Sequence, residues 1–303
     1  MLKRCEGGLN LKPQKTYDCF CYFNEDMLLE LRLKTLWDVV DVFVIVEASY
    51  QHSGLEKPLN FSKERFKKYI SKIRYFVATH CPGGRGDPWA NERAQRDEII
   101  KGLHDAHPED RIVISDLDEI PYPDAFERYD PRKKRGDFQQ QYFSYYFNNR
   151  LVEPKGELVW HGSKITLFRY FVDFFDGSAT AVRSYKSKGL LRSLKRTWFR
   201  LRHTQRIDQG GWHFTWIMSV DGIVEKMNAT AHQENNRPAW RTEEYISNTI
   251  AAGRDLVREN RRYSIMEIDD SFPRELQTNR RAYTGFILSR PIEDGKSSYR
   301  PSI

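Results

Sequence analysis

Short apolar runs separated by helical patterns are the feature that most restricts the fold of this 303-residue chain. The run Val42–Val46 is apolar at every position, which is typical of a parallel strand covered on both faces. Three similar runs occur at Cys19–Phe23, Tyr75–Ala78 and Ile112–Ile114. Alternating strands and helices favour a parallel sheet with right-handed crossovers, so we expect a mostly parallel α/β sheet flanked by helices.

The helical patterns between these runs have recognisable starts. Asn24 is a candidate helix cap, and Glu25 and Asp26 follow it in the first turn, where the helix dipole favours acids. Ser62 is a candidate cap for a second helix that ends near Lys72. Further helices are expected over residues 89–103, 225–234 and 242–260, and strands over residues 137–147 and 210–220.

Composition indicates a folded globular protein, because 39% of the residues are hydrophobic and 14% are aromatic. The first 15 residues contain no apolar signal-peptide core, and no apolar run approaches the ~20 residues of a spanning helix. The four cysteines (Cys5, Cys19, Cys21 and Cys81) lack zinc-site spacing, which favours free thiols in a reducing compartment. We expect a cytoplasmic protein, with peripheral contact at a membrane face as a further expectation.

The net charge of +7 is unevenly distributed. Between Arg183 and Arg206 there are nine Lys or Arg residues and no Asp or Glu, so this segment carries +9 and the rest carries −2. Leu190, Leu191, Leu194, Trp198 and Leu201 recur there at helical spacing. We expect a basic helix that contacts an acceptor or an anionic membrane surface and stays outside the donor site, with an ordinary basic surface helix as the alternative.

The strongest chemical signal is Asp116-Leu117-Asp118, which directly follows the apolar strand Arg111–Ile114. Parallel sheets bind ligands at the carboxyl ends of their strands. Two carboxylates at such an end can hold a hard divalent cation, which in turn neutralises a departing diphosphate. The alternative is a pair of solvated loop acids.

Two other functions use the same residues or charges. A haloacid-dehalogenase-like phosphatase would use Asp116 as phosphoryl acceptor and Asp118 as acid or base. In that family the motif usually opens the fold, whereas here it closes the fourth strand. A non-catalytic binding module would grip nucleic acid through residues 183–206, but no nucleic-acid motif accompanies these cations, so we expect no nucleic-acid partner.

Several stretches in order resemble glycosyltransferase family 17. They span roughly residues 17 to 260 and comprise Asp38–Ala48, Lys57–Phe61, Gly83–Arg85, Asp116–Pro121 and Gly211–His213. The resemblance implies a GT-A fold, a UDP-sugar donor, Mn²⁺ or Mg²⁺, and inverting transfer of a sugar such as N-acetylglucosamine to a glycan or glycolipid. Animal members carry an N-terminal membrane anchor that this sequence lacks, which suggests a bacterial or viral relative and puts an N-glycan acceptor in doubt.

The resemblance also divides the chain and assigns further residues. We expect one GT-A domain over 1–303, with a nucleotide-sugar half at about 17–122, an acceptor half at about 123–260 and a tail at 261–303. His213 is the expected third metal ligand, beside Asp116 and Asp118; the alternative is a structural histidine. Expected donor-binding residues are Glu25 and Glu47 at strand ends, Arg85, Arg93 and Arg96 for the diphosphate, and Trp212 for the sugar.

Inverting transfer needs a general base for the acceptor hydroxyl. The sequence offers three candidates, Glu119, Asp176 and Glu234, and does not decide between them. Glu119 lies next to the metal motif, so it is also a candidate for orienting the site.

Overall fold

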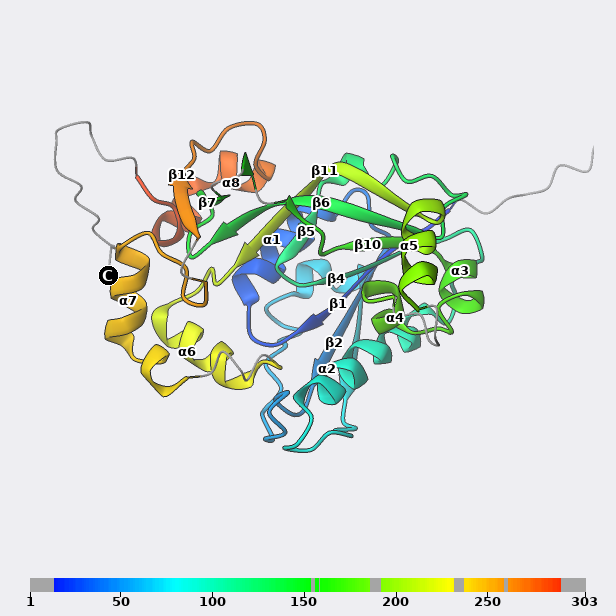
Figure 1. Ribbon diagram of the computed structural model, residues 1–303, viewed down its shortest axis with the longest axis horizontal. Coiled ribbons are helices and arrows are strands. Elements are labelled where there is room, and N and C mark those ends of the chain that lie inside the picture. Colours follow the sequence, from blue (N-terminus) through cyan, green and yellow to red (C-terminus); the bar gives the residue numbers. More distant parts are fainter. Residues whose placement is uncertain are drawn as a thin grey trace, which may run out of the picture.

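The apolar runs of the first half become the parallel strands of one sheet, with helices against both faces (Figure 1). The computed structural model describes residues 14–153, 156–157, 159–185, 192–231, 237–258 and 261–289. The strands are β1 (Thr16–Tyr22), β2 (Val42–Ala48), β3 (Ile73–Ala78), β4 (Arg111–Asp116), β5 (Glu119–Pro121), β6 (Arg135–Ser144), β7 (Asn149–Glu153), β8 (Gly156–Glu157), β9 (Val159–Trp160), β10 (Lys164–Leu167), β11 (Thr204–Thr215) and β12 (Arg262–Ile265).

Helices of two kinds connect these strands. The α-helices are α1 (Asp26–Leu36), α2 (Pro88–Asp97), α3 (Phe168–Asp173), α4 (Ala179–Arg183), α5 (Arg192–Arg202), α6 (Val220–Ala229), α7 (Glu243–Ala251) and α8 (Arg274–Thr278). The 3-10 helices are η1 (Lys67–Lys72), η2 (Glu98–Leu103), η3 (Pro123–Ala125), η5 (Pro238–Trp240) and η6 (Arg280–Phe286).

The sheet has a parallel part and a mixed part. Its order is β12-β7-β6-β10-β4-β1-β2-β3, and β4, β1, β2 and β3 pair in parallel. Beyond β4, strand β10 runs antiparallel to both β4 and β6. Strand β11 lies parallel to β6 and antiparallel to the short β5. The predicted α/β class, a largely parallel sheet flanked by helices with a less regular second half, is confirmed.

Apolar side chains fill both faces of the sheet. One core packs Phe20, Phe43 and Ile45 against α1 and the C-terminal segment. The other packs Cys19, Val44 and Val46 against η2, α3, α4 and a phenylalanine of α5. Burial on both faces is the physical reason that the run Val42–Val46 has no polar position.

Some predicted helices are shorter than expected. The pattern at Ser62–Lys72 forms turns and then η1, with the Ser62 hydroxyl accepting from the Arg65 N–H. The pattern at Trp89–Leu103 divides into α2 and η2. Helix α1 begins at Asp26, with Glu25 and not Asn24 at its cap position. The described cysteines, Cys19, Cys21 and Cys81, are free thiols, as predicted.

The segment predicted as a C-terminal tail contributes to the fold. Strand β12 pairs with β7, and Leu276 of α8 and Tyr283 of η6 are buried in the core beneath α1. Within the described ranges no helix is both long and apolar enough to cross a membrane.

Candidate active site

A cavity of about 370 Å³ opens at the carboxyl ends of β1, β2 and β4. Tyr22, Ala48 and Asp116, which end these three strands, line it. The opposite wall comes from the end of β11, from α6 and from Asp255, Val257, Arg258 and Arg261. Its size is within the range of pockets that bind nucleotides and similar small ligands. The cavity lies where the sequence predicts a ligand crevice.

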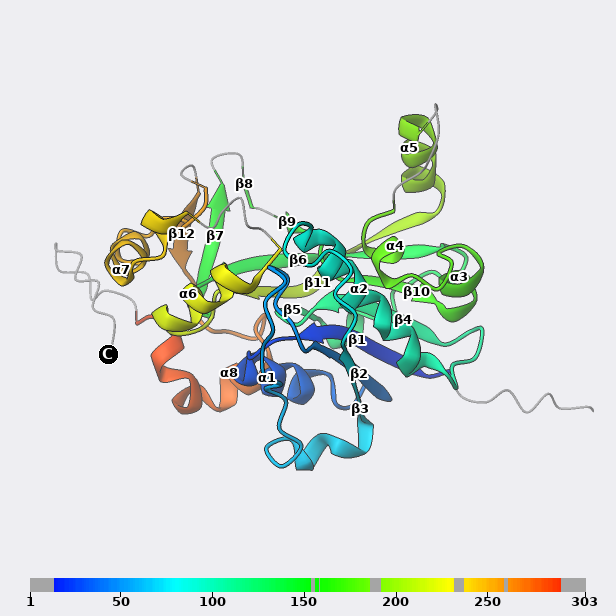
Figure 2. The same ribbon diagram turned by 90° about the horizontal axis from the view of Figure 1, so that it is seen from below.

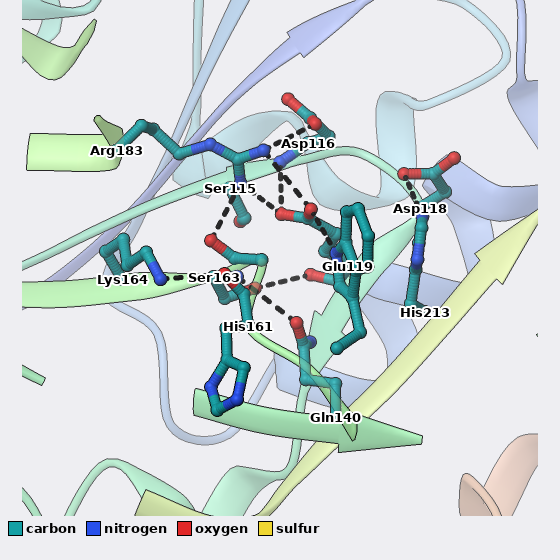
Figure 3. Close-up of polar contacts among 12 residues, drawn as sticks. Ser115, Asp116, Asp118, Glu119, Gln140, His161, Ser163, Lys164, Arg183 and His213 are labelled. Atoms are coloured by element: carbon teal, nitrogen blue, oxygen red, sulfur yellow. Dashed lines mark hydrogen bonds and ion pairs between the residues drawn. The ribbon is translucent and has the colours of Figure 1, made fainter. Parts of the chain in front are cut away.

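The carboxylate of Asp116 is held between two arginines. Its Oδ1 accepts from the Arg96 guanidinium at 2.9 Å. Its Oδ2 accepts from Arg183 at 2.6 Å (Figure 3). Burial raises the pKa of Asp116, but the positive charges of Arg183 and Arg96 outweigh it, so this pKa lies below its usual range. Asp116 is therefore a charged carboxylate with both oxygens engaged.

Asp118 faces a different set of partners. Its Oδ1 lies 3.5 Å from His213 Nε2, and its Oδ2 lies 3.3 Å from Lys226 Nζ. The same ammonium is 3.1 Å from Glu25 Oε1. Burial again opposes ionisation, yet Lys226 and His213 hold the pKa of Asp118 below its usual range. The two carboxylates thus point in different directions, Asp116 toward the arginines and Asp118 toward the imidazole.

A backbone clamp sets this separation. Arg32 of α1 is fully buried and pairs with Asp18 through two hydrogen bonds. Its guanidinium also donates to the carbonyls of Asp116, Leu117 and Glu119. One side chain from the first helix therefore fixes the turn that aims both carboxylates. The helical pattern that follows Asn24 predicts the helix but does not single out this arginine.

His213 sits between two aromatic rings. Trp160 stacks on the imidazole with centroids 4.7 Å apart, and Tyr142 meets it edge-on at 4.7 Å. Nδ1 of His213 is buried and has no hydrogen-bond partner among the described residues. Ring packing thus holds the imidazole, and its Nε2, which lies 3.5 Å from Asp118 Oδ1, is the nitrogen placed to act as a ligand.

The donor set fits a small divalent cation only in part. Asp118 and His213 face each other, and their oxygen and nitrogen atoms are ligand types that Mn²⁺ accepts. Asp116 lines the same cavity but points to the arginines. Across the described residues no three His, Cys, Asp or Glu side chains come close enough to form a complete metal site. A cation here would be held by Asp118 and His213, with ligand oxygens filling its other positions.

Glu119 lies behind the cavity wall. Its carboxylate is fully buried and accepts from the Asp116 backbone N–H at 2.9 Å and from Trp160 Nε1 at 2.8 Å. It also binds the guanidinium of Arg183. Because these donors occupy the carboxylate and it does not line the cavity, Glu119 orients the site and does not face an acceptor.

A second candidate for the general base, Asp176, is also away from the cavity. Asp176 is an exposed turn residue next to Gly177, in a left-handed conformation with φ 53°, and it does not line the cavity. The third candidate, Glu234, lies outside the described residues. Of the predicted bases, the two that the structure describes, Glu119 and Asp176, do not line the cavity.

The predicted donor-binding residues divide into two groups. Glu25 and Arg96 line the cavity, whereas Glu47, Arg85, Arg93 and Trp212 do not. Glu47 is fully buried because its carboxylate accepts from Lys57, Tyr75 and the backbone N–H groups of Asn60 and Phe61. It anchors the loop after β2 and leaves no oxygen for a nucleoside.

The remaining misplaced residues are explained by packing and exposure. Arg85 and Arg93 are exposed on the loop and helix that follow β3, where Arg93 meets only Asp87 at 3.4 Å. Trp212 is buried in the core on the far side of β11, and its Nε1 donates to Ser271 O. Trp216, one residue beyond the strand end, lines the cavity instead.

Arg183 corrects the prediction for the basic segment. The sequence analysis places all of residues 183–206 outside the donor site, but Arg183 of α4 bridges the carboxylates of Asp116 and Glu119 (Figure 3). Arg183 is one of many cations in this segment, so no local sequence pattern distinguishes it from its neighbours. Only the return of the chain to β4, through β10, brings it there.

Other cavity residues were not predicted because they come from segments without a motif. They are Lys226 of α6, Tyr142, Trp160, Asp255, Arg258 and Arg261. Asp255 accepts from two backbone N–H groups and from the Tyr263 hydroxyl, and it lies 3.6 Å from Arg261. These residues line the cavity beside the aspartates and His213.

Comparison with known proteins relates the chain to one family. Residues 6–131 match the model of glycosyltransferase family 17. The chain is 26% identical to beta-1,4-mannosyl-glycoprotein 4-beta-N-acetylglucosaminyltransferase of Rattus norvegicus over 266 residues, which are 80% of this chain and 48% of the relative. The human protein of the same name is 26% identical over 247 residues, 75% of this chain and 45% of its own length. The chain thus spans about half the length of the curated relatives it matches.

Among solved structures, the chain is similar to glucosyl-3-phosphoglycerate synthase from Mycobacterium tuberculosis in complex with Mn²⁺ and UDP-glucose. The TM-score is 0.36 at 9% identity, over 88% of this chain and 92% of that chain. The sequence comparisons confirm the resemblance to family 17.

Proposed function

We propose that this chain, which resembles glycosyltransferase family 17, transfers N-acetylglucosamine from a UDP-sugar to a hydroxyl of a glycan or glycolipid. The transfer proceeds with inversion at the sugar and uses Mn²⁺ or Mg²⁺. The observation that carries this proposal is the pair Asp116 and Asp118 at the end of β4, inside a cavity that also presents Arg96 and Lys226. The choice of N-acetylglucosamine as the transferred sugar comes from the names of the relatives.

The charges of the cavity suit a diphosphate. Arg96 is buried between Asp116 and Glu92, at 2.9 Å and 2.6 Å, and Lys226 lies between Asp118 and Glu25. Positive groups that are already fixed by carboxylates can meet a developing negative charge without reorganising. The departing nucleotide would thus be stabilised by residues from both halves of the chain.

A divalent cation, when bound, supplies further Lewis-acid assistance to the leaving nucleotide. Asp118 and His213 would hold it, since they are the facing oxygen and nitrogen donors of the cavity. Asp116, which keeps two arginines in place, would act by orienting these guanidinium groups toward the phosphates.

The aromatic wall supports a carbohydrate as acceptor. Trp160, Tyr142 and Trp216 line the cavity opposite the strand ends. Flat aromatic faces pack against the apolar C–H faces of sugar rings, while polar groups at the rim fix orientation. A glycan or glycolipid end would therefore approach from this side, toward the space between Asp118 and His213.

The same geometry disfavours the alternatives. A phosphatase of the haloacid-dehalogenase type needs Asp116 as a nucleophile, but both of its oxygens are bound by arginines. A binding module based on residues 183–206 would present its cations together, whereas Arg183 is engaged in ion pairs with Asp116 and Glu119.

A donor-hydrolysis screen tests the proposal. Purified protein is incubated with UDP-N-acetylglucosamine, UDP-glucose and UDP-galactose, with Mn²⁺, Mg²⁺ or EDTA, and released UDP is measured. We expect metal-dependent release that is fastest with UDP-N-acetylglucosamine. Equal release in EDTA would contradict the metal, and release from no UDP-sugar would contradict the donor.

A further inference from the structure

Helix α5 exposes three large apolar side chains on one face. Leu194, Trp198 and Leu201 are 66%, 56% and 70% exposed, whereas the other exposed large hydrophobic residues of the described chain are 39–47% exposed. Spacings of four and three residues place these side chains in one stripe along the helix. This is the most exposed apolar surface in the described part of the molecule.

The body of the protein does not cover this stripe. Phe199 attaches α5 to the fold by stacking on Tyr185 and Phe174, and it is turned roughly 140° around the helix from Leu194. Figure 2 shows α5 standing away from the rest of the molecule. The stripe therefore points outward, away from the contact that holds the helix.

Helix α5 takes no part in the cavity. None of its described side chains lines the space around Asp116 and Asp118. Of the two roles that the sequence offers for this segment, a cover for the acceptor cleft is therefore disfavoured, and a contact surface remains.

The charge around the stripe is positive. Arg200 and Arg202 are exposed on the helix, and Arg206 is exposed on β11 just beyond it. Nearby, Lys133 donates to the carbonyl of Arg202, while the exposed Arg132 is paired with Asp130. No acidic residue occurs between Arg183 and Arg206. A partner surface with negative charge would complement this region.

We propose that α5 is an interfacial helix that docks on an anionic lipid surface. The stripe would enter the boundary between head groups and acyl chains, and the flanking arginines would meet lipid phosphates and carboxylates. A stable protein interface buries roughly 800 Å² on each partner, and three side chains on an eleven-residue helix provide far less. Shallow insertion assisted by charge needs no such area.

Vesicle flotation tests this proposal directly. The full chain is mixed with phosphatidylcholine vesicles or with vesicles rich in phosphatidylserine, at low and high salt. We expect flotation with the anionic vesicles at low salt and little with the neutral ones. The variant Leu194→Ser/Trp198→Ser/Leu201→Ser should lose it, whereas the matched control Leu55→Ser/Leu59→Ser, which removes exposed leucines elsewhere, should keep it.

A second variant separates charge from apolar contact. Replacing Arg200 and Arg202 with Gln should lower the affinity for anionic vesicles roughly twentyfold, because each cation near such a surface contributes several-fold. UDP release from the donor should be unchanged in all these variants, since α5 lies outside the cavity. This readout keeps a failure of lipid binding distinct from a failure of the proposed reaction.

Three results would overturn the proposal. One is the absence of flotation with anionic vesicles. Another is flotation that survives the triple substitution. The third is a concentration-dependent dimer, seen by light scattering, that the triple substitution abolishes, because the stripe would then be an interface between copies of this chain.

Discussion

The parallel part of the molecule and its mixed part contribute to one cavity in different ways. Strands β1, β2 and β4 deliver Asp116 and Asp118 to a sheet edge that the topology fixes. Strand β11 and helices α4 and α6 deliver His213, Arg183 and Lys226, which neutralise or flank those carboxylates. Both carboxylates thus come from the regular half, which also supplies Arg32 and Arg96 against them, and the irregular half adds the three further partners.

The largest effect should follow a change at the carboxylates. Asp118→Asn removes the charge that faces both His213 and Lys226, so we expect sugar transfer to fall roughly a thousandfold. Released UDP measures this, with melting temperature as the check on folding. Asp124→Asn, an exposed acid outside the cavity, is the matched control. Full activity in Asp118→Asn would contradict a role in sugar transfer for this carboxylate of the parallel half.

The next prediction compares Arg183, which is paired with carboxylates, with Arg200, which is exposed on the same basic segment. Arg183→Ala leaves Glu119 buried without its charge partner, so the free energy of unfolding should fall by roughly 4 kcal/mol, and transfer should fall as well. Arg200→Ala, at an exposed position, should change that free energy by less than about 0.5 kcal/mol. Urea unfolding measures both.

A double variant makes this comparison sharper. Adding Glu119→Gln to Arg183→Ala removes the unpaired charge, so part of the lost stability should return. If Glu119→Gln changed the free energy of unfolding by the same amount with and without Arg183, the two side chains would not be coupled.

Neighbouring residues of β11 should separate packing from chemistry. Trp212→Ala opens a hole in the core and should lower the free energy of unfolding by roughly 3 kcal/mol. His213→Ala should change stability less, and it should raise the Mn²⁺ concentration needed for half-maximal activity. A His213 variant that melts early with unchanged metal dependence would assign this residue to packing alone.

The smallest effect concerns Lys164, where β10 joins the two parts. Burial lowers its pKa to about 8, against the opposing charge of Asp137. The unfolded chain therefore binds more protons between about pH 8 and the ordinary value of 10.5, so stability rises with pH there, by at most about 1.4 kcal/mol per pH unit. The melting-temperature difference between wild type and Lys164→Met should grow in favour of wild type from pH 8 to 10. A constant difference would contradict the shifted pKa.

Sequence patterns predicted the parallel half well, because local physics decides it. Strands covered on both faces must be apolar throughout, and parallel strands place their ends on one edge. The pattern therefore located Asp116 and Asp118. It failed at Glu47, whose carboxylate serves the loop at Asn60 and Phe61, because a strand-end acid looks the same whether it binds backbone or ligand.

The mixed half could be predicted only in outline. His213 was found because a known motif contains it, whereas Lys226 sits on a helix without one. Arg183 was assigned to the wrong surface, since its partners Asp116 and Glu119 lie 67 and 64 residues away in the chain. Contacts at such separations depend on the path of the chain through β10 and α4, and no local pattern encodes them.

Calorimetric titration of UDP into the protein, with and without Mn²⁺, tests most directly whether both halves build one donor site. The account predicts that wild type binds UDP more tightly with Mn²⁺, that Asp118→Asn abolishes this gain, and that Arg183→Lys weakens UDP binding although it retains the charge. If both variants bound UDP and Mn²⁺ as wild type does, the cavity at the end of β4 would not be the donor site.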